Sequence, residues 1–143
     1  DRNRMFISYT DIGAFVSEDG GKTWDSATRE GMPRRWVNTT YWMEFDPKVK
    51  GRVWAVASGV HDLPRPKMWR GRSTSTYNGG VVISEDGGRT WRVADENLPP
   101  SAATHIVLDP ASPVNARVLY MTAFGRGVYK TTDGGKRDRK SVV

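Results

Sequence analysis

Aromatic and basic side chains recur in the segments that the sequence predicts to be loops. Aromatic rings stack on the faces of sugars, and the fork-shaped guanidinium of arginine binds a carboxylate or sulfate through two hydrogen bonds. Loops that carry both kinds of side chain suit a hydroxyl-rich or anionic ligand. The candidate ligand-binding residues are Arg34, Arg35, Trp36, His61, Asp62, Arg65, Trp69, Arg70, Tyr77, Asn78, Phe124 and Arg126.

The same loops have a structural interpretation, in which Trp69 and Tyr77 pack beneath a solvated segment and hold it in place. The long segment 59–78 nevertheless favours function as a whole, because long loops without regular structure are uncommon unless they are functional or disordered. His61 and Asp62 are adjacent, but His105 is the only other histidine and lies on a predicted strand, so we predict no metal site. No phosphate-binding glycine loop precedes a helix, and we predict no cofactor.

A repeated motif indicates which elements position these loops. Ser17–Trp24 and Ser84–Trp91 are almost identical, and Thr131–Lys136 is a partial third copy. Each copy follows an apolar strand, and its Asp-Gly-Gly is typical of a hairpin turn, because glycine adopts positive φ without steric cost. We predict that the fixed positions are structural: Ser17, Asp19, Gly21, Trp24, Ser84, Asp86, Gly88, Trp91, Thr131, Asp133 and Gly135.

The pattern Ser-x-Asp-x-Gly-x-x-Trp resembles the Asp-box, or BNR repeat, of β-propellers. Relatives with this repeat include sialidases, family 74 glycoside hydrolases, sortilin-type receptors and a photosystem II assembly factor, so the repeat alone does not decide the function. The resemblance implies an all-β fold. A propeller typically has four to eight four-stranded blades of roughly 40–50 residues each, so 143 residues are expected to form a fragment of about two and a half antiparallel blades.

The motif spacing predicts the boundaries of the blades. Residues 1–28 supply the outer strands of a first blade, 29–95 a second blade with the insertion 59–78, and 96–137 a truncated third blade. In the third blade we align Arg117–Met121 with Arg52–Val56 of the second. Residues 138–143 interrupt the motif and match the translation of a common sequencing adapter, which indicates a non-native tail from a metagenomic assembly; a genuine basic tail is the alternative.

The direction of the strands separates the two kinds of loop. Strands in a meander alternate in direction, so the repeated turns are expected on one face and the insertion 59–78 on the opposite face, together with Asp11, the loop at 34–36 and the turn at 124–126. The aspartates of the turns are therefore predicted to hold the backbone, and a site is predicted opposite them.

Asp11 is the candidate catalytic residue, on the basis of a second resemblance. The segment Tyr9–Phe15 is similar to the Thr-Asp-Ile-Gly-Gly-Ala-Tyr segment of family 74 glycoside hydrolases, whose aspartate is a catalytic carboxylate, although one of the two glycines is missing here. Glycoside hydrolysis needs a second carboxylate, which in that family comes from a second propeller; Asp62 is a candidate within the chain. The alternative is that Asp11 only forms the turn before Gly13.

Charge and composition limit the remaining classes of function. The net charge is +6 and there is no cysteine, which excludes disulfides and thiolate zinc sites. The basic residues are scattered, so we predict no nucleic-acid partner, and no run is long and apolar enough to span a membrane. A sialidase would show an Arg-Ile-Pro segment, which is absent.

Three functional hypotheses follow. The first is a carbohydrate-active propeller, a glycosidase resembling the xyloglucanases, whose isolated fragment is not expected to be active. The second is a non-catalytic propeller that binds a protein or glycan. The third is an assembly-factor scaffold whose arginines meet an acidic partner. Localisation is open, and the family resemblance favours a secreted or periplasmic bacterial protein.

Overall fold

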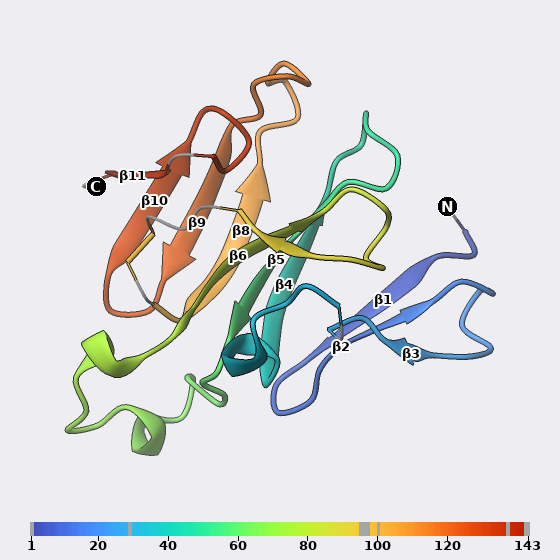
Figure 1. Cartoon of the computed structure of the whole chain (residues 1–143). Helices are drawn as coiled ribbons and strands as arrows, with labels where there is room; N and C mark the ends of the chain where they lie inside the picture. Colours follow the sequence, from blue (N-terminus) through green and yellow to red (C-terminus); the bar gives the residue numbers. More distant parts are fainter. Residues whose placement is uncertain (1, 29, 95–97, 100, 137, 142–143) are drawn as a thin grey trace.

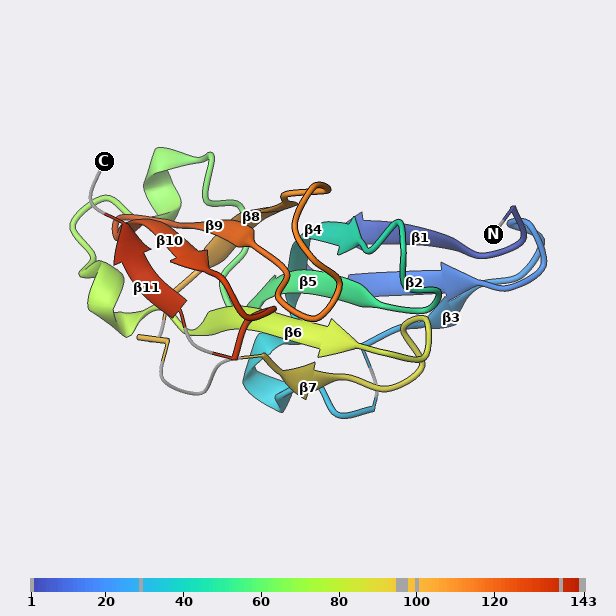
Figure 2. The same cartoon turned by 90° about the horizontal axis from the view of Figure 1, so that it is seen from above.

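The computed structural model describes residues 2–28, 30–94, 98–99, 101–136 and 138–141, and these form a nearly all-β structure (Figures 1 and 2). The strands are β1 Met5–Tyr9, β2 Gly13–Ser17, β3 Asp25–Ser26, β4 Thr39–Phe45, β5 Val53–Ser58, β6 Gly79–Ser84, β7 Arg92–Val93, β8 Ala103–Leu108, β9 Leu119–Ala123, β10 Gly127–Thr131 and β11 Asp138–Ser141. Three short 3-10 helices are η1 Arg34–Trp36, η2 Pro66–Met68 and η3 Thr74–Thr76. The all-β prediction is confirmed.

The strands lie in three consecutive groups, which follow one another across the molecule in Figure 1. The first group is β1–β3, the second is the antiparallel order β4-β5-β6-β7, and the third is the four-stranded sheet β8-β9-β10-β11. A single parallel bridge between Gly13 and Thr39 joins the first group to the second. The expected blade boundary at residues 95 and 96 lies outside the described residues.

The third group repeats the second, but with a register that differs from the sequence alignment. A β-bulge lies just before Trp42 in β4 and just before His105 in β8. The backbone amide of Gly87 donates to Gly51 O, and that of Gly134 donates in the same way to Arg117 O. Arg117 therefore stands at the position of Gly51, and the predicted alignment of Arg117–Met121 was wrong by one residue.

Residues 138–141 of the predicted tail form β11, which pairs with β10 from Thr131↔Asp138 to Val128↔Ser141. In this pairing Lys130, the residue before Thr131, lies opposite Arg139. In the second group Ile83, the residue before Ser84, lies opposite Arg92, so the outer strand follows the motif at the same distance in both groups. Strand pairing uses backbone groups that any residue except proline supplies, so the pairing carries no information on the origin of the tail. Residues 142–143 lie outside the described residues.

The repeated turns, here called aspartate turns, are held by hydrogen bonds from the side chains at the fixed positions of the motif. In the Ser84–Trp91 turn, Ser84 Oγ donates to Asp86 Oδ1 at 2.8 Å and accepts from the amide of Gly88 at 2.7 Å. Asp86 Oδ1 also accepts the amide of Thr90 at 3.0 Å, and Asp86 Oδ2 accepts the Thr90 hydroxyl at 2.6 Å. The Ser17–Trp24 turn repeats this set of bonds. Since these carboxylates are occupied by their own turns, their role in the structure is to fix the backbone.

Two apolar clusters hold the groups together. One lies between the second and third groups and includes Trp54 and Ile106, and the other lies between the first and second and includes Met43 and Trp91. The indole N–H of Trp91 donates to Ala27 O of the first group at 2.6 Å. The tryptophan of the motif therefore packs one strand group against the next.

Lowering the pH from about 5 to about 2 is expected to reduce the free energy of unfolding. Hydrogen bonds from Thr23 lower the pKa of Asp19 to about 2. Burial raises the pKa of Asp86, but the bonds from Thr90 and Ser84 outweigh it and hold that pKa below its usual range. A carboxyl whose folded pKa is depressed stabilises the fold above its unfolded pKa, about 3.9 for aspartate, and this contribution is lost as the pH falls through the folded pKa.

Urea denaturation across this pH range measures the effect. Asp86→Asn should show a shallower decline than the wild type, because one depressed carboxyl is removed. Equal slopes would contradict a stabilising role for the ionised Asp86.

Candidate functional site

The insertion 59–78 is an ordered loop packed on the ends of the strands, drawn in green in Figure 1. Leu63 and Tyr77 are 3% and 4% exposed and form an apolar cluster with Ala102, against which Phe124 also packs. The indole N–H of Trp69 donates to Leu63 O at 3.0 Å. The loop thus has a small core of its own, which fixes the side chains that it carries.

The insertion is also tied to the strand groups beneath it. The Tyr41 hydroxyl of β4 donates to Val60 O at 3.0 Å, and burial raises the pKa of that phenol. Ser58 Oγ donates to Asn78 O at 2.8 Å at the other end of the loop. A Cβ atom on Gly125, in the β9–β10 turn, would lie 2.5 Å from Thr74 Cγ2. The insertion therefore reaches the third group as well as its own.

Leu63→Ala is expected to weaken the docking of the insertion by roughly 2–5 kcal/mol, the usual cost of truncating a buried leucine. Trypsin measures this directly, because the loop carries several basic residues that it cleaves once the loop opens. Cleavage within 64–73 should become faster in Leu63→Ala and stay unchanged in Ile12→Ala, which truncates an exposed side chain. Equal cleavage rates in the two variants would show that Leu63 does not anchor the loop.

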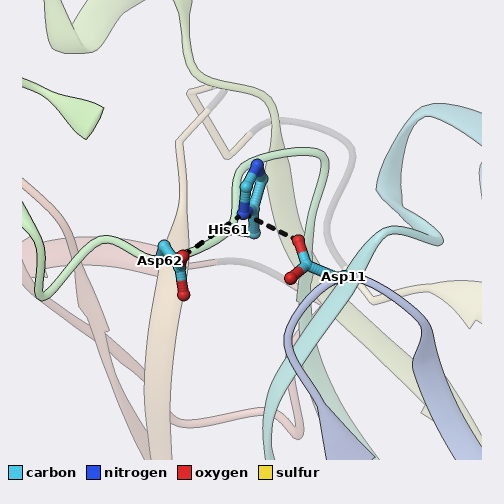
Figure 3. A group of neighbouring side chains, drawn as sticks. All are labelled: Asp11, His61 and Asp62. Carbon is cyan, nitrogen blue, oxygen red and sulfur yellow. Dashed lines mark ion pairs between the residues drawn. The ribbon is translucent and has the colours of Figure 1, made fainter. Parts of the chain in front are cut away.

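Asp11 lies in the turn between β1 and β2, at the end of the strands that faces the insertion. Its backbone has a φ of 81°, and the side-chain amide of Asn38 donates to its carbonyl oxygen at 3.2 Å. Asp11 Oδ1 lies 2.7 Å from Nδ1 of His61, and about half of the carboxylate side chain is exposed. Figure 3 shows the two side chains approaching each other from different loops. The structure thus brings together two residues that are 50 positions apart in the sequence.

Asp62 approaches the same imidazole from the insertion. Its Oδ2 lies 3.8 Å from His61 Nδ1 (Figure 3). The same oxygen lies 3.5 Å from Arg65 Nη1. One ligand atom from each of Asp11, His61 and Asp62 lies within 4.8 Å of the others. An imidazole nitrogen with two carboxylate oxygens is a donor set that suits zinc, although these groups already pair with one another.

These distances indicate whether Asp62 could act as the second catalytic carboxylate beside Asp11. The two carboxyl groups of a glycosidase flank the scissile bond, roughly 5–5.5 Å or 6.5–9.5 Å apart according to mechanism. Here His61 lies against both aspartates, and the two carboxylate oxygens are within 4.8 Å. They therefore do not border an open gap that could hold a sugar.

The predicted ligand-binding residues differ in exposure. Arg34, Arg35, Arg65, Trp69 and Arg70 are exposed, and His61, Asp62, Asn78, Phe124 and Arg126 are partly buried. Trp69 keeps 37% of its surface exposed while its ring lies 5.9 Å from that of Phe124. The exposed residues are accessible to a ligand, and the partly buried residues lie beside them.

The prediction that Trp36 and Tyr77 bind a ligand was wrong, because both side chains are buried. Trp36 is 7% exposed and lies in the core, where a Cβ on Gly80 would be 3.0 Å from its ring. Tyr77 belongs to the cluster beneath the insertion and donates its hydroxyl to Met68 O at 3.3 Å. Neither ring has a free face for a ligand. The burial of Tyr77 agrees with the structural interpretation of the loop, in which this ring packs beneath it; no such alternative was stated for Trp36.

Sequence reasoning also overlooked residues that support the site. Asn38 donates to the backbone of Asp11, and Tyr41 donates to the backbone of the insertion at Val60. Neither residue belongs to a recognisable motif. Lys67 and Arg72, by contrast, belong to the loop that the sequence predicted for this face, and both are exposed on the insertion.

The face that carries the aspartate turns has a groove of about 780 Å³. It is lined by the β4–β5 loop, by the Ser84–Trp91 turn and by Arg4. Its arginines are paired, since Arg52 contacts Glu85 at 2.9 Å and Arg4 contacts Glu18. The groove lies at the other end of the strands from Asp11.

Comparison with known proteins gives two similar curated sequences. The oligoxyloglucan-reducing end-specific xyloglucanase of Emericella nidulans is 30% identical over 91 residues, which are 62% of this chain and 9% of that protein. The xyloglucanase of Hypocrea jecorina is 29% identical over 140 residues, 88% of this chain and 15% of that protein. The chain therefore spans only a small part of the length of these relatives. No family model matches it.

Solved structures establish the fold. An ancestral GH74 enzyme superposes with a TM-score of 0.69 at 20% identity, over 99% of this chain and 17% of that chain. A structure described as YCF48 bound to D1 peptide gives 0.57 at 19% identity, over 97% and 37%. The predicted resemblance to the GH74-type propellers is confirmed, as is the β-propeller fold class. Among the described residues, no helix has the length and apolar character needed to cross a membrane.

Proposed function

We propose that this chain is part of a carbohydrate-active β-propeller that binds a polysaccharide on the insertion face and supplies Asp11 as one carboxylate for glycoside hydrolysis. Sequence similarity to two xyloglucanases supports the carbohydrate-active class. The roles proposed for individual residues are argued from the contacts of Asp11 and the insertion.

The contact between His61 and Asp11 carries the proposal. Asp11 was singled out by its local motif, and the insertion by its length and composition. The 2.7 Å approach of their side chains places both at one location. A carboxylate that is half exposed, beside an ordered loop with an exposed tryptophan, is accessible to a chain of sugars.

The chemistry assigned to Asp11 requires its carboxylate to be held in a fixed direction. His61 Nδ1 contacts one oxygen, which leaves the other free to face a substrate. In glycoside hydrolysis such a group donates a proton to the leaving oxygen, activates water or attacks the sugar, and a second carboxylate completes the pair. Because Asp62 lies against the same imidazole, we assign the second carboxylate to a part of the protein beyond this chain.

The test is hydrolysis by a protein that carries this sequence within a complete propeller set. Neutral and acidic β-linked polysaccharides are supplied in parallel, and released reducing ends are measured. Reducing ends that depend on Asp11 support the proposal. A folded protein that binds soluble polysaccharide but hydrolyses none, with or without Asp11, would contradict the catalytic part and leave a binding propeller.

A further inference from the structure

The insertion carries a strong excess of positive charge. Residues 59–78 contain Arg65, Lys67, Arg70 and Arg72 against the single acid Asp62, so their formal charge is 4 − 1 = +3, half of the +6 of the whole chain. The relatives that define the proposed activity are named for xyloglucan, which is a neutral polymer. A loop that held only neutral sugars would have no need of this charge.

These cations are presented by a fixed support. All four side chains are exposed, while Leu63 and Tyr77 bury the underside of the loop. Only Arg65 forms an ion pair with another described residue, the 3.5 Å contact with Asp62. Because the contacts of Leu63 and Tyr77 hold the loop from beneath, the backbone that presents the four side chains is supported by the fold rather than by a ligand.

Neighbouring loops on the same face extend the charge. Arg34 and Arg35 of η1 are exposed, and Arg126 of the β9–β10 turn lies partly buried close to the insertion. The acidic side chains of this face include Asp11 and Asp62, which lie 2.7 and 3.8 Å from His61 Nδ1. Clustered charge of one sign raises the local concentration of oppositely charged ligands.

We infer that the insertion face binds an anionic polysaccharide, one whose sugars carry carboxylates. This inference rests on the proposed function and names the ligand class for the same face. Guanidinium groups pair with carboxylates through two hydrogen bonds, and the exposed ring of Trp69 lies next to Arg70 in the sequence, where it offers a surface for a sugar. The ring favours a saccharide over an acidic protein.

The experiment is binding of the 143-residue chain to three soluble polymers by affinity electrophoresis and calorimetry. Polygalacturonate is the acidic polysaccharide, xyloglucan the neutral one, and polyglutamate a polyanion without sugars. The test variant combines Arg65→Gln, Lys67→Gln, Arg70→Gln and Arg72→Gln. The matched control removes four exposed lysines of the aspartate-turn face through Lys22→Gln, Lys48→Gln, Lys50→Gln and Lys136→Gln. Near-UV circular dichroism checks the fold of both.

The wild-type chain should bind polygalacturonate at least about tenfold more tightly than either xyloglucan or polyglutamate. The test variant should lose about tenfold or more in affinity, because it removes four exposed cations that would pair with the polymer. The control variant should lose less than about threefold. Added salt should weaken binding to the wild type more than to the test variant.

Three results overturn the inference. Equal losses in both variants would mean that net charge alone attracts the polymer. Equal binding of polyglutamate and polygalacturonate would point to an acidic protein partner. Preference for xyloglucan, unchanged in the test variant, would reject the anionic ligand while leaving the proposed carbohydrate function intact.

Discussion

Asp11→Asn is expected to lower the rate of polysaccharide hydrolysis by roughly 10²–10⁴-fold, the usual contribution of a positioned acid or base. The substitution keeps the shape of the side chain and an oxygen for His61, but removes the ionisable group. Asparagine also tolerates the left-handed backbone found at this position, where φ is 81°. The melting temperature should therefore stay close to that of the wild type, and initial rates at saturating substrate measure the loss in kcat.

Asp86→Ala is the matched control on the opposite face. It removes an aspartate of similar sequence context, yet one whose side-chain hydrogen bonds to the described residues lie within its own turn. We expect a loss of about 2 kcal/mol in stability, because hydrogen bonds to charged groups contribute at this level, with activity per folded molecule retained. If Asp11→Asn instead unfolds the protein while its folded fraction remains fully active, Asp11 is a structural turn residue.

Arg117→Met is expected to destabilise the chain by about 3–5 kcal/mol, as does breaking other buried ion pairs. Arg117 is 1% exposed and bridges the second and third strand groups, with Nε 2.9 Å and Nη2 2.5 Å from the two carboxylate oxygens of Asp46. Its Nη1 donates to Ser112 O. Burial raises the pKa of Asp46, but Arg117 outweighs it and holds that pKa below its usual range. Removing the arginine leaves the buried Asp46 carboxylate with only the longer contact to Arg52 and the backbone amide of Lys48.

Urea denaturation of the chain measures this difference, and Arg52→Met provides the control. Arg52 also contacts Asp46, at 3.5 Å, but is 22% exposed and is expected to contribute about 1 kcal/mol or less. The double variant Asp46→Leu with Arg117→Met should recover part of the loss, since it removes the buried charge that has lost its main partner. A loss for Arg117→Met no greater than for Arg52→Met would show that the bridge does not hold the two groups together.

The strand pattern could be predicted from the sequence because it is local. Short apolar runs followed by Asp-Gly-Gly turns indicate that a strand precedes each repeated turn, and the motif spacing reveals the insertion. The predicted alignment of Arg117 was wrong because composition does not reveal that two loops differ in length by one residue. The backbone bonds from Gly87 and Gly134, together with the pairs Val53↔Ser84 and Leu119↔Thr131, define the true register.

The site could be predicted only in part, for a physical reason. Residue types at 34–36 and 59–78 indicated a ligand-binding face, but the inward direction of Trp36 and Tyr77 depends on packing against Gly80 and Leu63, which are distant in sequence or lie within an irregular loop. Nor does any local pattern show that His61 lies between two aspartates.

The sequence by itself determined the repeated strands, the aspartate turns and the separation of those turns from the insertion, because each follows from short-range periodicity and glycine placement. The tertiary structure alone decided which side chains meet. The packing of the insertion on Leu63 and Tyr77 brings His61 to Asp11, and the packing of the strand groups brings Arg117 to Asp46. Those contacts depend on long-range burial, in which the positions of whole loops, rather than local propensities, determine the distances between charged groups.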